Sequence, residues 1–69
     1  MNDPFPGLTT RERHVLDALT AGASTTQITD RLGLSDKTVR NHISNILTKL
    51  EVVDPTQAVL KAREAELGR

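Results

Sequence analysis

The sequence contains no cysteine, no tryptophan and no tyrosine, and its single aromatic residue is Phe5. Without cysteine, neither a disulfide framework nor a thiolate metal site is possible, so packing alone must hold the fold together. No segment approaches the roughly 18 consecutive apolar residues of a membrane span, and residues 1–8, MNDPFPGL, lack the basic and apolar regions of a signal peptide. We therefore expect an unprocessed cytoplasmic protein without a membrane partner.

The length and the charge of the chain set further limits. With 69 residues there is room for one small domain, which buries only about 60% of the surface of its unfolded chain. Nine Lys and Arg balance nine Asp and Glu, whereas a domain that docks on nucleic acid usually has a basic excess. The charges are unevenly placed, because residues 35–50 carry three basic side chains and one acid. A neutral total is therefore compatible with a locally basic surface.

Turn and capping residues mark the N-terminal segment and a first helix. Residues 2–7, NDPFPG, contain two prolines and a glycine, which predicts a linker or arm over residues 1–7 and a folded domain over residues 8–67. Phe5 is expected to cover the rim of the core. Thr9 and Glu12, three residues apart, form a capping box, so a helix should begin there and end at Gly22.

Two further helices are predicted to follow in close succession. Ser24 and Gln27 repeat the capping box, and Gly33 suits the left-handed conformation that ends a helix. Ser35 is the next N-cap and lies only two residues further on. The two helices must therefore cross steeply, which is a helix-turn-helix arrangement.

A fourth helix completes an all-α, tetrahelical bundle. Asp54, Pro55 and Gln57 fit the N-cap, N1 and N3 positions, where the missing N–H of proline costs nothing. The helix should run toward Leu67 and stop at Gly68. The residues of this helix expected to pack inward are Ala58, Ala62 and Ala65.

The third predicted helix has two unlike faces. At about 100° per residue, one face collects apolar side chains, namely Val39, Ile43, Ile46, Leu47 and Leu50. The other face is polar and carries Lys37, Arg40, Asn41, Ser44, Asn45 and Thr48. Asn and Ser have poor helix propensity, so a surface selected for stability alone would not combine them. A DNA major groove favours such residues, because Arg reads guanine, Asn reads adenine, and Ser or Thr reaches base edges or phosphates.

The segment LTTRERHVLDALTAGASTTQITDRLGLSDKTVRNHISNILTKL, residues 8–50, resembles the LuxR-type helix-turn-helix domain found at the C-terminus of response regulators of the NarL and FixJ kind. The resemblance extends to about residue 62 and rests on several parts in the same order. These parts are LTTRE at the first helix, the pattern I..RL.LS..TV.NHISNIL.KL, and TQAV in the last helix. In that family the third helix enters the major groove and the fourth commonly forms a dimer interface.

The resemblance implies roles for particular residues of this chain. It places Arg40, Asn41 and Ser44 toward the bases. Its candidate contacts to the DNA backbone are Thr25, Thr26, Lys37, Thr38, Asn45, Thr48 and Lys49. Its candidate dimer contacts are Val59, Leu60 and Arg63. The implied function is sequence-specific binding of double-stranded DNA in transcriptional regulation, as the C-terminal effector domain of a two-component response regulator or, alternatively, as a standalone relative. The further partners are a second copy, in a homodimer through the fourth helix, and RNA polymerase.

Three residues depart from the family pattern. Thr29 stands where alanine is usual, close to the crossing of the second and third helices, and its extra bulk should loosen the motif. Glu51 replaces a usual glycine after KL, which brings the geometry of that turn into question. Ser44 replaces a longer basic residue, so a base contact there would be shorter or water-mediated.

Two other interpretations remain open at this point. A sigma-factor region 4-like module shares the RE start and the TV of the recognition helix, and works beside RNA polymerase. A protein-interaction domain that has lost DNA contact would suit the neutral charge.

Catalysis is not expected from this sequence. It shows no nucleophile with its base, no phosphate-binding loop and no paired acid–base carboxylates. We expect no metal and no cofactor, because the two histidines lack carboxylates at ligand spacing. His14 is expected at the surface, and His42 to make a structural hydrogen bond or a phosphate contact.

Overall fold

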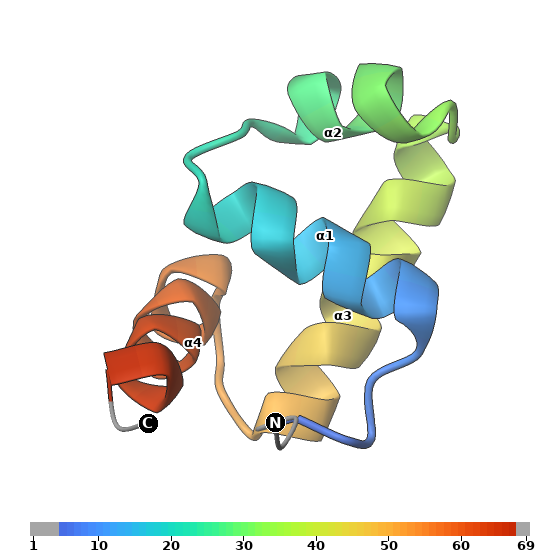
Figure 1. Cartoon of the computed structure of the whole chain (residues 1–69). Helices are drawn as coiled ribbons and strands as arrows, with labels where there is room; N and C mark the ends of the chain where they lie inside the picture. The colour runs from blue at the N-terminus through green and yellow to red at the C-terminus, as the bar shows by residue number, and fades with distance from the viewer. Residues whose placement is uncertain (1–4, 68–69) are drawn as a thin grey trace.

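The computed structural model describes residues 5–67 of the chain. Over this range the secondary structure consists of α1 (Thr10–Thr20), α2 (Thr25–Leu32), α3 (Asp36–Leu50) and α4 (Pro55–Leu67). These four helices, with no strand between residues 5 and 67, confirm the all-α prediction (Figure 1). The predicted stop of α4, Gly68, lies outside the described residues.

Capping side chains begin the helices where the sequence predicted. At α1 the Thr9 hydroxyl accepts a hydrogen bond from the Glu12 N–H at 3.1 Å, and Glu12 Oε1 accepts one from the Thr9 N–H at 2.9 Å. Ser24 and Gln27 make the same reciprocal pair at α2. Each box satisfies backbone donors that have no partner inside the helix, so the two helix starts are fixed locally.

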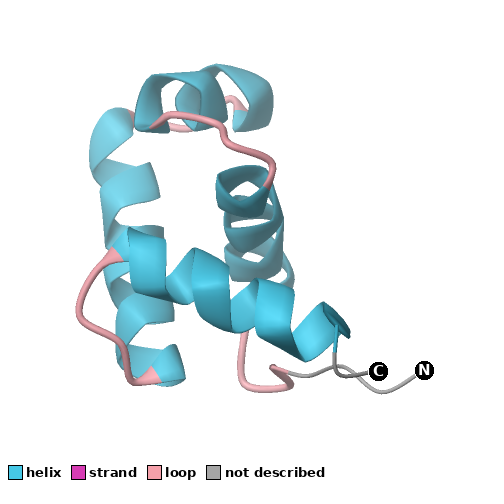
Figure 2. Ribbon diagram, turned by 90° about the vertical axis from the view of Figure 1, so that its left-hand side faces the viewer, coloured by secondary structure: helices cyan, strands magenta, loops and turns pink. Residues whose placement is uncertain are grey.

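The turn between α2 and α3 is as short as predicted. Gly33 has φ 65°, the left-handed conformation that glycine adopts without a Cβ penalty, and its N–H donates to the Thr29 carbonyl. Two residues later the Ser35 hydroxyl caps α3 by accepting a hydrogen bond from the Thr38 N–H at 3.1 Å. Helices α2 and α3 therefore form a helix-turn-helix, in which α2 lies at one end of α3 and α4 packs toward the other (Figures 1 and 2).

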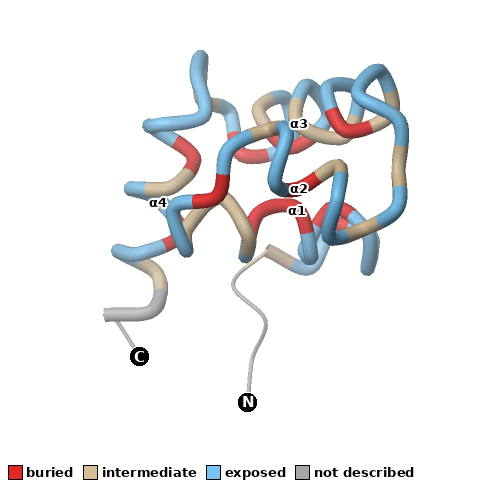
Figure 3. The backbone as a smooth tube through the Cα atoms, turned by 90° about the horizontal axis from the view of Figure 1, so that it is seen from above, coloured by how far each residue is buried: buried red, intermediate tan, exposed pale blue. Residues whose placement is uncertain are grey.

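The core collects side chains from all four helices. Val15, Ile28, Val39 and Ile46 are fully buried, one from each of α1 and α2 and two from α3. Burial of each such side chain stabilises the fold by about 1.5–3 kcal/mol relative to exposure. The alanines of α4 complete the core, because Ala58 and Ala62 are buried and Ala65 is half-buried. Figure 3 shows the buried positions gathered on the inner sides of the helices.

Two cationic side chains bind α4 to the ends of other helices. The Lys61 ammonium donates to the Leu50 carbonyl at 2.7 Å, and the Arg63 guanidinium donates to the Thr20 carbonyl at 3.1 Å. These carbonyls lie at the C-termini of α3 and α1, where the helix dipole favours positive charge. Helix α4 is thus attached to the domain by hydrogen bonds to the C-terminal ends of α3 and α1 as well as by the packing of its alanines.

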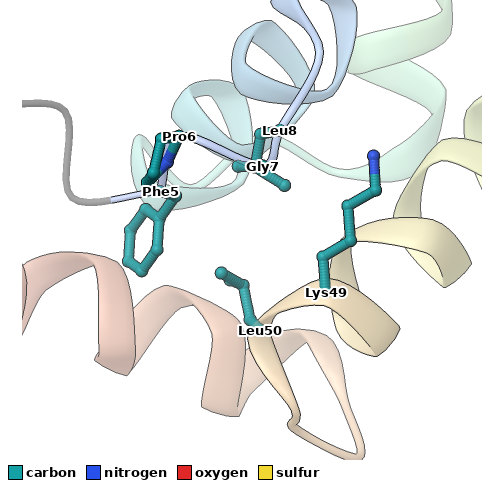
Figure 4. Close-up of a pocket in the computed structure, with 6 residues that line it drawn as sticks. All are labelled: Phe5, Pro6, Gly7, Leu8, Lys49 and Leu50. Atoms are coloured by element: carbon teal, nitrogen blue, oxygen red, sulfur yellow. The ribbon is translucent and has the colours of Figure 1, made fainter.

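The N-terminal arm packs against the end of α3. Phe5 is half-buried and contacts the core cluster, which confirms its predicted place on the rim. A small open cavity of about 170 Å³ lies here, lined by Phe5, Pro6, Gly7, Leu8, Lys49 and Leu50 (Figure 4). Its one charged lining group, the Lys49 ammonium, is bound to Glu12. The cavity therefore offers no set of free polar groups that would orient a ligand.

Glu51 ends α3 in the left-handed conformation, with φ 59° and ψ 45°. It is the one residue other than glycine with positive φ among those described. Its N–H and that of Val52 donate to carbonyls in the last turn of α3, so the turn has the geometry that glycine usually provides. The departure from the family pattern at this position leaves the turn in place but adds strain.

Candidate nucleic-acid interface

The polar face of α3 predicted from the sequence is exposed along its whole length. We call it the outward face and define it by Lys37, Arg40, Asn41, Ser44, Asn45 and Thr48, all of which are exposed. The opposite side of the helix is anchored by Val39, Ile46 and Leu50, which are buried, while Ile43 and Leu47 are half-buried. The outward face therefore presents two cations and four short hydrogen-bonding side chains to the surroundings.

Arg40 forms the one ion pair on this face. Its Nε lies 2.9 Å from Asp36 Oδ2, one helical turn earlier, and the two side chains are 74% and 54% exposed. Lys37, by contrast, has no ion pair with another residue between positions 5 and 67. Among residues 5–67, Lys37 thus has no ion pair and Arg40 has a carboxylate neighbour.

The remaining predicted backbone contacts include Thr38 and Thr48 of α3 and two threonines at the start of α2. Thr48 donates its hydroxyl to the Ser44 carbonyl at 3.2 Å, and Thr38, half-buried, accepts a hydrogen bond from the Ser35 hydroxyl at 2.8 Å. At the start of α2, Thr26 is exposed and Thr25 is half-buried. The oxygens of a DNA backbone only accept hydrogen bonds, so these threonines can contact it by donating a hydroxyl proton, which Thr48 directs to the Ser44 carbonyl.

Lys49 was predicted to contact the DNA backbone, and within the fold it forms an ion pair with α1. Its ammonium lies 2.7 Å from Oε1 of Glu12, a buried side chain in the first turn of α1. The sequence predicted Glu12 only as a member of the capping box, which is present. Its ion pair with Lys49 was missed because the two residues are 37 positions apart, and no local spacing indicates such a contact. The contact of Lys49 with the DNA backbone stays a prediction; because its ammonium is engaged by Glu12, we do not include Lys49 among the proposed backbone contacts.

The Glu12 carboxylate stays charged because of its partners. Burial alone would raise its pKa, but hydrogen bonds from the Lys49 ammonium and the Thr9 N–H, together with the Lys49 charge, lower the pKa below its ordinary value. The unfolded chain therefore binds the Glu12 proton more tightly than the folded one. The stability that this pair contributes is present above the unfolded pKa and is lost as pH falls through the folded pKa.

The predicted dimer residues lie on α4 in unequal settings. Leu60 is 52% exposed and Val59 is half-buried. Arg63 is exposed but its guanidinium is held by the Thr20 carbonyl of the same chain. A second apolar side chain, Val53, is 80% exposed just before α4 begins.

Neither histidine indicates a metal or catalytic centre. His14 is exposed. His42 is half-buried and makes no side-chain hydrogen bond to any residue between positions 5 and 67, so of its two predicted roles the structural hydrogen bond is absent from this range and the phosphate contact stays a prediction. Within the same range no three His, Asp or Glu side chains gather as metal ligands do. No helix in this range is both long and apolar enough to span a bilayer.

Comparison with known families agrees with this architecture. Residues 6–62 match the family model of the bacterial regulatory proteins of the luxR family, whose model carries the name GerE. The chain belongs to the luxR family. The matched segment, which we call the LuxR domain, contains the whole helix-turn-helix and the outward face.

Individual relatives share a large part of the LuxR domain. The chain is 43% identical to the DNA-binding transcriptional activator DevR/DosR of Mycobacterium tuberculosis over 67 residues, an alignment that covers 97% of this chain and 31% of that protein. It is 45% identical over 60 residues to the response regulator protein VraR of Staphylococcus aureus, covering 87% of this chain and 29% of that protein. The chain thus spans about a third of these relatives.

A solved structure supports the same fold for the LuxR domain. The structure of the transcription factor GerE matches with a TM-score of 0.76 and 44% sequence identity, over 86% of this chain and 88% of that one. The two chains are therefore alike in sequence as well as in fold over most of their length.

Proposed function

We infer that this LuxR domain binds duplex DNA in a sequence-specific manner to regulate transcription, with α3 in the major groove. The observation that carries the inference is the outward face, where six exposed side chains are of the kinds that read base edges or contact phosphates. Arg40, Asn41 and Ser44 are the residues we assign to the bases. Lys37 and Asn45, with the threonines Thr25, Thr26, Thr38 and Thr48, are assigned to the DNA backbone.

The role in a longer regulator follows from the relatives. Family membership argues against the sigma-factor region 4-like alternative, and similarity to a response regulator favours an effector domain of a two-component system. A regulator of bacterial transcription works in the cytoplasm, where the chromosome lies.

The neutral charge of the chain sets a quantitative expectation for binding. With Lys49 bound to Glu12, the outward face offers only Lys37 and Arg40 as cations. Because Arg40 is assigned to a base, Lys37 is the one phosphate-neutralising cation of this face, and one such contact per copy predicts that affinity falls about three- to fourfold between 50 and 200 mM salt. A protein-interaction domain without DNA contact would show no such dependence.

Pairing of two copies through α4 would double the number of phosphate contacts, and with it the slope of log affinity against log salt concentration. The exposed Leu60 and the half-buried Val59 form a small apolar surface, which supports a weak homodimer at most. Two recognition helices about one DNA turn apart would then select inverted half-sites about 10 base pairs apart.

Selection from a random duplex pool tests the proposal. Enriched sites, with a salt-dependent Kd for the enriched duplex, support sequence-specific binding, and inverted half-sites support the dimer. A single enriched half-site retains DNA reading and rejects the dimer. No enrichment together with no salt-dependent binding contradicts DNA binding, and returns the outward face to solvent or to a protein partner.

A further inference from the structure

The Arg40–Asp36 pair lies inside the surface assigned to the bases. Asp36 is the first residue of α3, next to the Ser35 cap, where the helix dipole favours a carboxylate. Its Oδ2 lies 2.9 Å from Arg40 Nε, and both side chains are more than half exposed. The carboxylate thus occupies the Nε side of the guanidinium.

The choice of nitrogen matters because a guanidinium carries five N–H donors in a fixed plane. Asp36 is bonded to Nε. The two terminal nitrogens, Nη1 and Nη2, form a separate end of the fork, and this end matches the O6 and N7 acceptors of guanine. An arginine held at Nε therefore still has the donors that a bidentate contact with guanine requires.

We propose that Asp36 is a positioning residue that determines base specificity, by holding the Arg40 guanidinium so that its terminal nitrogens meet one guanine. The inference rests on the proposed function. In water such an exposed pair contributes little, but entry into the groove displaces water and strengthens it. Held at Nε, Arg40 is also hindered from turning to a neighbouring phosphate.

The same carboxylate has a cost for affinity. Asp36 is negative and accepts hydrogen bonds only, so it repels the phosphates of every duplex regardless of sequence. Asp36 thus lowers general affinity and raises discrimination, a use of repulsion that is common in specific interfaces. If Asp36 only stabilised the fold, its removal would lower affinity and base preference together. If Asp36 positions Arg40, its removal raises affinity for unrelated DNA and lowers the preference for guanine.

The test uses selection from a random duplex pool with the whole chain and a set of variants. Arg40→Ala identifies the base position that Arg40 reads, because preference there is lost. Asp36→Ala is expected to lose guanine preference at this same position, by about fivefold, while its Kd for unrelated duplex DNA becomes lower. Asp36→Glu keeps a carboxylate one turn before Arg40 and is expected to restore the preference.

Two controls isolate the effect from charge and from folding. Asp17→Asn removes one negative charge from an exposed position of α1 and should leave the preference at the Arg40 position unchanged. In an Arg40→Ala background, Asp36→Ala should still raise general affinity but change preference at no position, since the residue it positions is gone. Helical circular dichroism confirms that each variant is folded.

Several results would overturn the assignment of Asp36. It is wrong if Asp36→Ala keeps the guanine preference, if it raises affinity equally at all sites without changing preference, or if the Arg40-dependent position favours a base other than guanine. If the unaltered chain selects sites that Arg40→Ala leaves unchanged, the inference fails while DNA binding stands. If the unaltered chain binds no duplex at any salt concentration, the proposed function itself fails.

Discussion

The outward and inward faces of α3 belong to one helix but obey different physical demands. The inward face buries Val39, Ile46 and Leu50, which supply stability by removing apolar surface from water. The outward face carries asparagines, serine and threonine, which supply neither burial nor good helix propensity. The N-cap and the packing of the inward face stabilise the helix. The outward face therefore does not need to add stability and can carry side chains suited to a ligand.

Two basic residues show the same division. Arg40 is 74% exposed and bonded only to a neighbouring surface carboxylate, whereas the Lys49 ammonium holds a carboxylate that is 4% exposed. The two residues have the same charge and lie on the same helix. What separates them is the partner supplied by the rest of the fold.

The largest expected effect comes from breaking the inward pair. Lys49→Met leaves Glu12 buried without a cation, so it should lower the free energy of unfolding by about 2 kcal/mol, less than for a fully buried pair because Lys49 is 38% exposed. Urea unfolding measures the change. Glu12→Gln keeps the capping box and removes only the charge, so its loss should be smaller. Equal stability of Lys49→Met and the unaltered chain would return Lys49 to the candidate DNA contacts.

The same pair predicts a dependence of stability on pH. Because the pKa of Glu12 is lowered in the folded state, the free energy of unfolding should decrease as the pH falls below about 4.3, the ordinary pKa of Glu, and through the lower folded pKa. Unfolding curves over this range should be flatter for Glu12→Gln than for the unaltered chain. Parallel curves would show that other carboxylates dominate acid unfolding.

A moderate gain is expected where α3 ends. Glu51→Gly removes the Cβ from a residue at φ 59°, which should raise the free energy of unfolding by about 1 kcal/mol. The outward face is not touched, so the Kd for a selected duplex should stay the same. A loss of stability would mean that the left-handed turn is not strained by Glu51.

The smallest effect is expected in α2. Thr29 donates its hydroxyl to the Thr25 carbonyl at 2.9 Å, a bond within the helix that leaves no buried partner unsatisfied when it is removed. Thr29→Ala should therefore raise stability by about 0.5 kcal/mol through better helix propensity. A thermal melt measures the shift, and DNA binding should be unaffected. A fall in the melting temperature would show that packing of the Thr29 methyl outweighs propensity.

Most of the fold was predictable because its signals are short-range. The capping residues, Gly33 and the apolar stripe of α3 act within three or four positions, so their spacing in the sequence contains the information. The ties between distant segments were not predictable. Glu12 with Lys49, and Arg63 with the Thr20 carbonyl, depend on how the helices cross, and no local pattern indicates which cation reaches which oxygen.

The outward face was predictable in composition but not in detail. Its polar residues followed from helical periodicity, whereas the order of bases they read depends on docking angle and DNA deformability as well as side-chain type. The Arg40–Asp36 pair has the i, i+4 spacing that favours ion pairs on a helix, so a signal for it was present in the sequence.

The most direct test of the division between the two faces measures Arg40→Ala and Lys49→Met side by side, for urea unfolding and for binding to the selected duplex. We predict that Arg40→Ala loses about 1–3 kcal/mol of discrimination between the selected duplex and one altered at its preferred base, with unchanged stability. Lys49→Met should lose stability and, where it is folded, retain Kd and preference. The opposite result, with Lys49→Met impaired in binding and Arg40→Ala unaffected, would contradict the assignment of the outward face to DNA.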